Sequence, residues 1–134
     1  MPVDENMPIL LVDDSKAMLA IIENLLNQIG FTNIDQASDA PSTLDMLRKK
    51  SYGLMLCDWD MDKTNGLDLL KVIRAAGANR DVPFILLTPE TRQQGIPAAI
   101  RAGASACILK PFTVQKLKEV IANVLLPKND GEGI

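Results

Sequence analysis

Five polar residues of the kinds that bind metal ions or transfer chemical groups lie at the ends of short apolar runs. Asp13 and Asp14 follow the first run, Asp58 the second, Thr88 the third and Lys110 the fourth. If these runs are neighbouring parallel strands, their carboxyl ends meet at one edge of a sheet, where such sheets place their binding sites. Three carboxylates, a hydroxyl and an ammonium would then lie close together.

The types of these side chains define the chemistry that the site could perform. Clustered carboxylates repel one another unless a cation lies among them. Mg²⁺ takes few protein carboxylates and completes its octahedron with water and phosphate oxygens. A carboxylate can also act as a nucleophile and form an aspartyl phosphate. A hydroxyl and an ammonium suit the oxygens of a phosphoryl group in transfer, so the set predicts Mg²⁺-dependent phosphoryl chemistry.

Each of these residues also has an ordinary structural interpretation. The acidic pair Asp13 and Asp14 could simply cap a helix, because Asp is a favoured N-cap residue. Asp58 could be a turn residue, Thr88 before Pro89 a strand exit, and Lys110 before Pro111 the opening of a loop. Four such coincidences at corresponding places in four successive runs are improbable, so a functional site is the better hypothesis.

Composition excludes several classes of function. The 134-residue chain contains no histidine, which removes Ser-His-Asp catalysis, HExxH zinc chemistry and any role as the phosphohistidine carrier. A net charge of −3 and a pI of about 4.9, with no basic run, disfavour nucleic acid as a partner. No apolar stretch is long enough to span a membrane, and residues 1–8 do not resemble a signal peptide. We therefore expect a cytoplasmic protein without a membrane partner, in which Cys57 and Cys107 are small buried hydrophobes.

Short apolar runs alternate with segments of helical periodicity along the whole chain. Strands are predicted at residues 9–12, 54–57, 84–87 and 106–109, with a weaker one at about 33–37. Helices are predicted between the strands at about 18–29, 40–47 and 67–73, and at 114–125 after the last strand. This order predicts an α/β fold, a doubly wound (βα)5 sandwich with a five-stranded parallel sheet and helices on both faces. Residues 8–126 would form one domain, and residues 1–7 and 127–134 would be flexible tails.

The site residues and their surroundings resemble the receiver domain of two-component response regulators, especially the stand-alone chemotaxis type. The resemblance covers roughly residues 8–126. The shared motifs are Val12-Asp13-Asp14-Ser15, Cys57-Asp58-Trp59, Asn65-Gly66, Leu87-Thr88, Ala102-Gly103-Ala104 and Lys110-Pro111-Phe112. The resemblance implies the strand order 2-1-3-4-5.

The resemblance also implies roles for individual residues. Asp58 would be the phosphoacceptor and carry the 4-aspartylphosphate. Asp14 and Asp58 would ligate Mg²⁺, with the Asp60 main-chain carbonyl as a third ligand and Asp13 acting through water. The Asp60 side chain would lie near the path of the hydrolytic water, where it could orient that water or pair with Lys110.

The remaining implications concern the phosphoryl group and the partners. Thr88 and Lys110 would hold phosphoryl oxygens, and the Lys110–Pro111 peptide bond would be cis. The donor would be a sensor histidine kinase or a histidine phosphotransfer protein, and the phosphorylated form would switch binding to a downstream protein target. The protein would be no enzyme beyond its own phosphorylation and dephosphorylation.

The sequence departs from the family pattern in the region through which a signal would leave. The acceptor loop, residues 58–62, carries three acids, and Pro89 has no N–H to offer the phosphoryl group. Cys107 stands where the family has an aromatic switch residue. Gly95 and Pro97 disfavour a full fourth helix, so we expect a short helix at about 97–102. The segment 89–96 would be a mobile loop that becomes ordered when Thr88 engages the phosphoryl group.

Two other functions remain open from the sequence. Residues 54–60 read as four apolar residues followed by DxD, like the nucleophile motif of haloacid-dehalogenase-type phosphatases, although that family has DxD on the first strand. A receiver fold that works only by docking, independently of phosphorylation, is the second alternative, suggested by Pro89 and Cys107. That scaffold would bind its partner equally well after Asp58 is neutralised.

Overall fold

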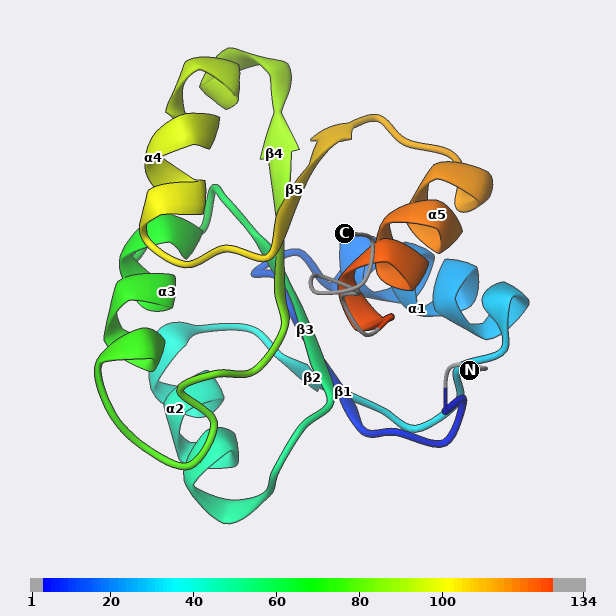
Figure 1. Ribbon diagram of the computed structural model, residues 1–134, viewed down its shortest axis with the longest axis horizontal. Helices are drawn as coiled ribbons and strands as arrows, with labels where there is room; N and C mark the ends of the chain where they lie inside the picture. The colour runs from blue at the N-terminus through cyan, green and yellow to red at the C-terminus, as the bar shows by residue number, and fades with distance from the viewer. Residues whose placement is uncertain (1–3, 127–134) are drawn as a thin grey trace, which may run out of the picture.

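Five parallel strands form the centre of the molecule (Figure 1). The computed structural model describes residues 4–126, so residues 1–3 of the first predicted tail (1–7) and the whole second predicted tail (127–134) lie outside the described residues. The strands are β1 (Ile9–Val12), β2 (Ile34–Ala37), β3 (Leu54–Asp58), β4 (Phe84–Pro89) and β5 (Ala106–Lys110). They lie in the order β2-β1-β3-β4-β5, which confirms both the predicted fold class and the strand order.

Helices cover both faces of the sheet. They are α1 (Lys16–Ile29), α2 (Ala40–Lys49), α3 (Gly66–Ala75), α4 (Ile96–Arg101) and α5 (Val114–Leu125), with a 3-10 helix η1 (Glu90–Gly95) before α4. Figure 1 shows α1 and α5 on one side of the sheet, and α2, α3 and α4 on the other. None of the helices within residues 4–126 is long and apolar enough to cross a membrane.

The apolar runs are continuous because each strand contributes to two cores. In β1, Ile9 and Leu11 pack in the cluster on the α1 and α5 side. Leu10 and Val12 pack in the cluster on the α2, α3 and α4 side. All four side chains are completely buried. Successive side chains of a strand point to opposite faces, so a strand covered on both faces needs no polar position until it ends.

Helix caps determine where the chain turns back after each strand. The Ser15 hydroxyl accepts a hydrogen bond from the Met18 N–H at 3.2 Å and begins α1. Gly30, at φ 122°, ends that helix as the sequence predicts, with its N–H donating to Leu26. Asn65 caps α3 in the same way as Ser15 caps α1, through the Asp68 N–H at 2.8 Å. The caps of α1 and α3 thus fix the loop that carries Asp13 and the loop that follows Asp58.

The region around the fourth helix agrees with the sequence prediction only in part. The α-helix is short, as expected, and has Pro97 in its first turn. The preceding segment is not an irregular loop: β4 extends to Pro89, and residues 90–95 form η1. Gly95 lies directly against the Trp59 ring, where an added Cβ would come within 2.7 Å of it. This tertiary contact supports a turn that the residues alone do not favour, and the expected ordering on phosphorylation stays a prediction.

At the amino-terminal end, residues 4–7 form a turn in which the Met7 N–H donates to the Asp4 carbonyl at 3.2 Å. Met7 is half-buried and packs against the cluster under α1 and α5. The described part of the predicted first tail is therefore in contact with the domain. Its flexibility stays a prediction.

Candidate functional site

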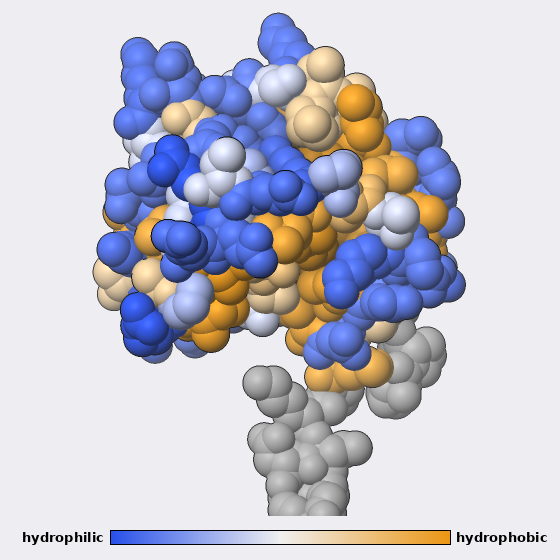
Figure 2. Space-filling view, turned by 90° about the horizontal axis from the view of Figure 1, so that it is seen from above, coloured by the Kyte–Doolittle hydropathy of each residue, from blue (hydrophilic) through white to orange (hydrophobic). Residues whose placement is uncertain are grey.

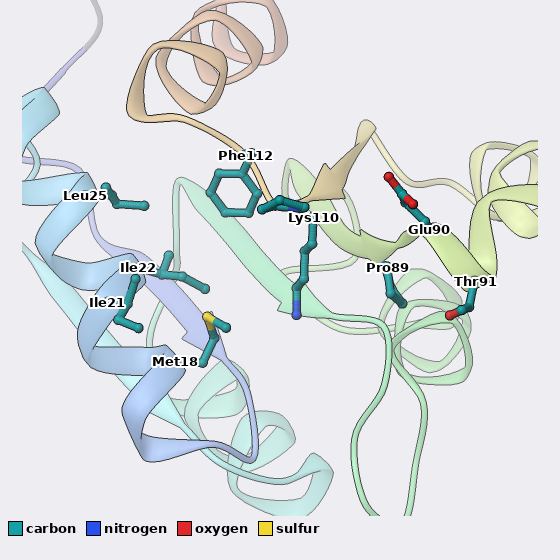
Figure 3. Close-up of a pocket in the computed structure, with 10 residues that line it drawn as sticks. Met18, Ile21, Ile22, Leu25, Pro89, Glu90, Thr91, Lys110 and Phe112 are labelled. Atoms are coloured by element: carbon teal, nitrogen blue, oxygen red, sulfur yellow. The ribbon is translucent and has the colours of Figure 1, made fainter.

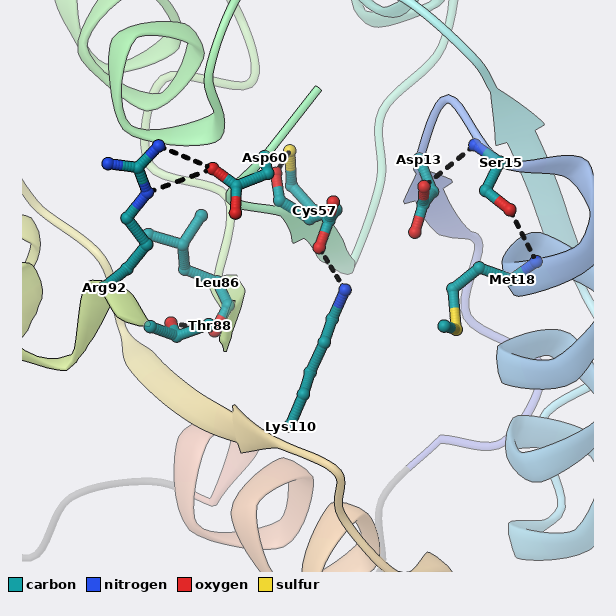
Figure 4. A network of polar contacts seen from close by, with 10 residues as sticks. Asp13, Ser15, Met18, Cys57, Asp60, Leu86, Thr88, Arg92 and Lys110 are labelled. Atoms are coloured by element: carbon teal, nitrogen blue, oxygen red, sulfur yellow. Dashed lines mark hydrogen bonds and ion pairs between the residues drawn. The ribbon is translucent and has the colours of Figure 1, made fainter. Parts of the chain in front are cut away.

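Four neighbouring strands deliver the predicted site residues to one edge of the sheet (Figure 4). Asp13 follows β1, Asp58 ends β3, Thr88 lies near the end of β4 and Lys110 ends β5. In the strand register, Asp58 lies opposite Leu87, one residue before Thr88. The parallel register therefore brings together residues that are as much as 97 positions apart, which is what their spacing predicts.

Three carboxylates form an acidic cluster at this edge. Oxygens of Asp13, Asp14 and Asp58 lie within 4.8 Å of one another. Asp13 and Asp58 are 2% and 5% exposed, whereas Asp14 is open to solvent. The Asp14 carboxylate accepts a hydrogen bond from the Asp62 N–H at 2.8 Å, which fixes the acceptor loop beside α1.

Asp13 has the least compensated charge in the cluster. One of its oxygens accepts the Ser15 N–H at 2.9 Å, and the other is buried without a partner among the described residues. Burial raises the pKa of Asp13, and the negative charges of Asp58 and Asp14 raise it further, against the lowering effect of Ser15 and Lys110. A buried carboxylate oxygen facing other carboxylates is stabilised by a cation. The cluster therefore has the donor set of a hard-cation site.

Asp58 combines burial with a direct cationic partner. Its carboxylate forms an ion pair with the ammonium of Lys110, which reaches across from β5 (Figure 4). Burial raises the pKa of Asp58, while Lys110 acts in the opposite direction and Asp60 and Asp14 add to the rise. A nucleophilic carboxylate must be ionised, so the ion pair with Lys110 and a cation in the cluster both favour the reactive form.

Thr88 lies at the same edge with its hydroxyl engaged by its own strand. The side chain is fully buried, and its hydroxyl donates to the Leu86 carbonyl at 3.3 Å. Cys107 of β5 lies beside it: burial raises the pKa of this thiol, and a hydrogen bond with Thr88 partly offsets the rise. To hold a phosphoryl oxygen, the Thr88 hydroxyl must turn away from Leu86.

The Asn65-Gly66 motif at the start of α3 contacts the backbone of the acceptor strand. The Gly66 N–H donates to the Trp59 carbonyl at 2.7 Å. A Cβ added at Gly66 would lie 2.4 Å from the Asp58 carbonyl oxygen, a distance that no side chain tolerates. Glycine at this position therefore allows α3 to begin directly against the acceptor strand.

Asp60 does not join the acidic cluster through its side chain. Its carboxylate accepts one hydrogen bond at 3.1 Å from the Nε of Arg92 in η1, and a second guanidinium nitrogen of Arg92 lies 3.1 Å from the same oxygen in an ion pair (Figure 4). Sequence reasoning missed Arg92, which lies 32 residues away in a segment where no helix was expected. The use of the Asp60 carbonyl as a metal ligand stays a prediction.

An apolar groove adjoins the acceptor. Its volume is about 520 Å³, and it is lined on one side by α1 and on the other by the ends of β4 and β5, including Pro89 and Phe112 (Figure 3). Ile21 lines the groove from α1 and is 55% exposed. Lys110 reaches along the same groove toward Asp58. Viewed from above, the molecule shows hydrophobic surface in the middle of this face with hydrophilic residues on either side (Figure 2).

Comparison with known proteins identifies the family. A family model described as the response regulator receiver domain matches residues 9–122. The chain belongs to this family. The receiver domain is 39% identical over 121 residues to the chemotaxis protein CheY-3 of Vibrio cholerae, and the match spans 90% of this chain and 93% of that protein. The match thus spans nearly the whole length of both chains.

Solved structures agree with this assignment. The receiver domain matches a response regulator receiver domain protein of Clostridium thermocellum with a TM-score of 0.80 and 27% identity, over 89% of this chain and 94% of the other. It matches the receiver domain of a sensor histidine kinase of Pseudomonas aeruginosa with a TM-score of 0.79 and 25% identity, over 90% and 98% of the two chains. That second structure has a magnesium ion coordinated in its active-site cleft. The protein is a signalling receiver domain rather than an enzyme of the ordinary kind.

Proposed function

We propose that this receiver domain acts as a single-domain response regulator that accepts a phosphoryl group on Asp58 from a phosphohistidine of another protein. The observation that carries the proposal is the position of Asp58, which is buried at a strand end, paired with Lys110 and within 4.8 Å of two further carboxylates. Family membership supports the same reaction. Because these 134 residues contain no histidine, the donor phosphohistidine must lie outside them.

The residues at the site fit a Mg²⁺ ion. Asp14 and Asp58 would bind it directly and Asp13 through water, so that the unpartnered Asp13 oxygen gains a counter-charge. The bound magnesium in the Pseudomonas receiver domain supports this choice of metal. When bound, the ion supplies positive charge that offsets the negative charge of a phosphoryl group in transfer.

The side chains of the receiver domain then perform the rest of the reaction. An Asp58 oxygen attacks phosphorus while the phosphorus–nitrogen bond to the donor imidazole breaks, and the imidazole takes a proton from solvent. The Lys110 ammonium moves from the Asp58 carboxylate to a phosphoryl oxygen. It stays within the site and neutralises negative charge on the phosphoryl group. Thr88 turns its hydroxyl from the Leu86 carbonyl to another phosphoryl oxygen.

The donor that we propose is a sensor histidine kinase or a histidine phosphotransfer protein. It must approach Asp58 along the carboxyl edge of the sheet, and the apolar groove between α1 and Phe112 offers it a contact surface next to Lys110. The phosphorylated receiver domain would then bind a downstream target protein. The likeness to a chemotaxis protein supports motility control as one such pathway.

The two alternative functions are not favoured. A haloacid-dehalogenase-type phosphatase needs the second acid of DxD as an acid/base, but here Asp60 is held by Arg92 and DxD lies at the end of the third strand. A scaffold that ignores phosphorylation would not need a complete acceptor site. The ion pair between Asp58 and Lys110 and the acidic cluster beside it therefore support a function that depends on phosphorylation.

The proposal is tested with a small phosphodonor. Wild-type protein incubated with acetyl phosphate and Mg²⁺ should gain the mass of one phosphoryl group, and omission of Mg²⁺ or the substitution Asp58→Asn should abolish the gain. Asp62→Asn, an exposed acid of the same loop, is the control and should be phosphorylated normally. Phosphorylation of the Asp58→Asn protein at the normal rate would refute the assignment.

A further inference from the structure

The ion pair between Asp60 and Arg92 connects the acceptor loop to η1. Arg92 reaches Asp60 through two nitrogens, its Nε and one terminal amine, each at 3.1 Å from the same carboxylate oxygen. Both side chains are about half exposed, at 55% and 47%. Ion pairs of this exposure contribute little to the stability of a fold, so stability alone does not account for the arrangement.

A second contact holds η1 in the position from which Arg92 can reach Asp60. Trp59, the neighbour of Asp60, is 6% exposed and has its ring against Gly95 at the end of η1. A Cβ at Gly95 would lie 2.7 Å from that ring, so only glycine permits the approach. Two consecutive residues after the acceptor are thus fixed to one six-residue segment.

The charge of Asp60 acts directly on the acceptor site. Asp60 lies two residues after Asp58, so its carboxylate adds a further negative charge next to the acceptor and the acidic cluster. Without its partner, the Asp60 carboxylate would increase the repulsion between the site and an anionic phosphodonor. An Asp60 carboxylate without a partner would also compete with Asp58 for the ammonium of Lys110. The ion pair between Asp60 and Arg92 removes this competition.

We propose that Arg92 is a positioning residue that holds the Asp60 carboxylate away from the acceptor and thereby allows rapid phosphorylation of Asp58. This proposal rests on the proposed function, since it concerns the rate of the same reaction. Arg92 touches none of the reacting groups, and its effect passes entirely through Asp60. The effect of removing Arg92 must therefore disappear when Asp60 carries no charge.

A cycle of four proteins tests this dependence, with the rate of mass gain in acetyl phosphate and Mg²⁺ as the readout. The proteins are wild type, Arg92→Gln, Asp60→Asn and the double variant. Arg92→Gln should be phosphorylated about two- to fivefold more slowly than wild type, the range expected of a half-exposed charge pair. In the Asp60→Asn background, the same substitution should leave the rate unchanged.

Two controls separate positioning from loss of charge or of structure. Arg101→Gln removes one positive charge from the adjacent helix α4, where Arg101 is exposed and makes no ion pair within residues 4–126, and it should keep the wild-type rate. Arg92→Lys keeps the charge and should recover part of the lost rate. The deficit of Arg92→Gln should also shrink as salt is raised, because exposed charges are screened.

The outcomes distinguish failure of this inference from failure of the proposed function. A wild-type rate for Arg92→Gln would overturn the inference, and so would an equal loss in both backgrounds, which would mean that Arg92 acts on the donor or the fold directly. In either case wild type would still be phosphorylated and Asp58→Asn would not. If wild type gains no phosphoryl group, or Asp58→Asn gains one normally, the proposed function fails and the inference falls with it.

Discussion

At the scale of single residues, the buried carboxylates that could make the site reactive also lower the stability of the fold. Asp13 and Asp58 are almost completely buried, and burial is the main cause that raises the pKa of each. Holding both as anions at neutral pH therefore costs folding free energy in the absence of a cation. The same cost makes the site ready to bind a cation and then a phosphoryl group.

The substitution Asp13→Asn should therefore stabilise the metal-free protein. The amide keeps an oxygen for the Ser15 N–H, and its NH₂ group can donate to the neighbouring carboxylates where Asp13 has an unpartnered oxygen. We expect the free energy of unfolding in urea, at neutral pH with a chelator, to rise by about 1 kcal/mol. Added Mg²⁺ should stabilise wild type more than the variant.

The pH dependence of this gain has a defined sign. The folded-state pKa of Asp13 lies above its unfolded value, so the cost of ionisation is present at neutral pH and is relieved as pH falls through the raised pKa. The advantage of Asp13→Asn should consequently shrink on acidification. Asp62→Asn, at an exposed position, should show neither effect. A variant less stable than wild type at neutral pH would contradict this account of the cluster.

Residue types at strand ends were enough to predict which side chains the sheet brings together, whereas the partner of Asp60 could not be predicted. Asp13, Asp58 and Lys110 each follow an apolar run, and a parallel sheet brings such positions together. Arg92 is an exposed arginine with no local pattern around it. Its contact with Asp60 depends on the course of η1, which tertiary packing determines.

At the scale of elements, the start of α3 governs the position of the acceptor strand. Gly66→Ala would force a Cβ to within 2.4 Å of the Asp58 carbonyl, so α3 or the acceptor strand must move. We expect a loss of about 1–3 kcal/mol in the free energy of unfolding, as for overpacking elsewhere, together with slower phosphorylation. Lys71→Ala, exposed in the same helix, should change neither. Wild-type stability and rate in Gly66→Ala would show that the close approach has no role.

The edge strand β2 is tied to the chain before β3 by a polar network. The Tyr52 hydroxyl donates to Asp35 at 2.7 Å, and the Lys50 ammonium contacts the same oxygen at 2.9 Å. The hydrogen bond from Tyr52, followed by that from Lys50, lowers the pKa of Asp35. Stability from a depressed carboxyl pKa is present above its unfolded value of 3.8 and is lost as pH falls through the folded value.

We therefore expect Tyr52→Phe to lower the free energy of unfolding by about 1 kcal/mol at neutral pH, the usual contribution of one hydrogen bond. The difference from wild type should decrease in acid as Asp35 becomes protonated. Urea titrations across this range measure it, with Asp45→Asn, which removes an exposed helix-surface pair, as the comparison. A difference that grows toward acid pH would contradict the assigned role of Asp35.

Periodicity predicted most elements well, and the failure around η1 has a physical cause. Helices α1 and α5 carry regular apolar stripes and end near the predicted residues. Between Pro89 and Pro97, the residues have no such stripe, and Gly95 disfavours a helix. The segment nevertheless forms the 3-10 helix η1. Its last residue, Gly95, lies against the Trp59 ring, and this contact joins residues that are far apart in the sequence.

At the scale of the whole molecule, the strand order places the acceptor at the centre. β3 lies between β1 and β4, so Asp58 has the acidic residues on one side, and Thr88 and Lys110 on the other. The alternation of strands and helices predicted a doubly wound sheet, but the order of the strands came from the resemblance to receiver domains. Many strand orders satisfy the same burial pattern, and the 2-1-3-4-5 order is one that places β1, β3, β4 and β5 side by side, as this site requires.

Phosphorylation of Asp58 is tested most directly by chemical identification of the modified residue. Borohydride reduces an aspartyl phosphate to homoserine and leaves free carboxylates intact. Protein treated with acetyl phosphate and Mg²⁺, then reduced, digested and analysed by tandem mass spectrometry, should carry homoserine at position 58 and aspartate at positions 13, 14 and 60. Homoserine at any of those other positions, or none at position 58 in protein that has gained a phosphoryl group, would contradict the account.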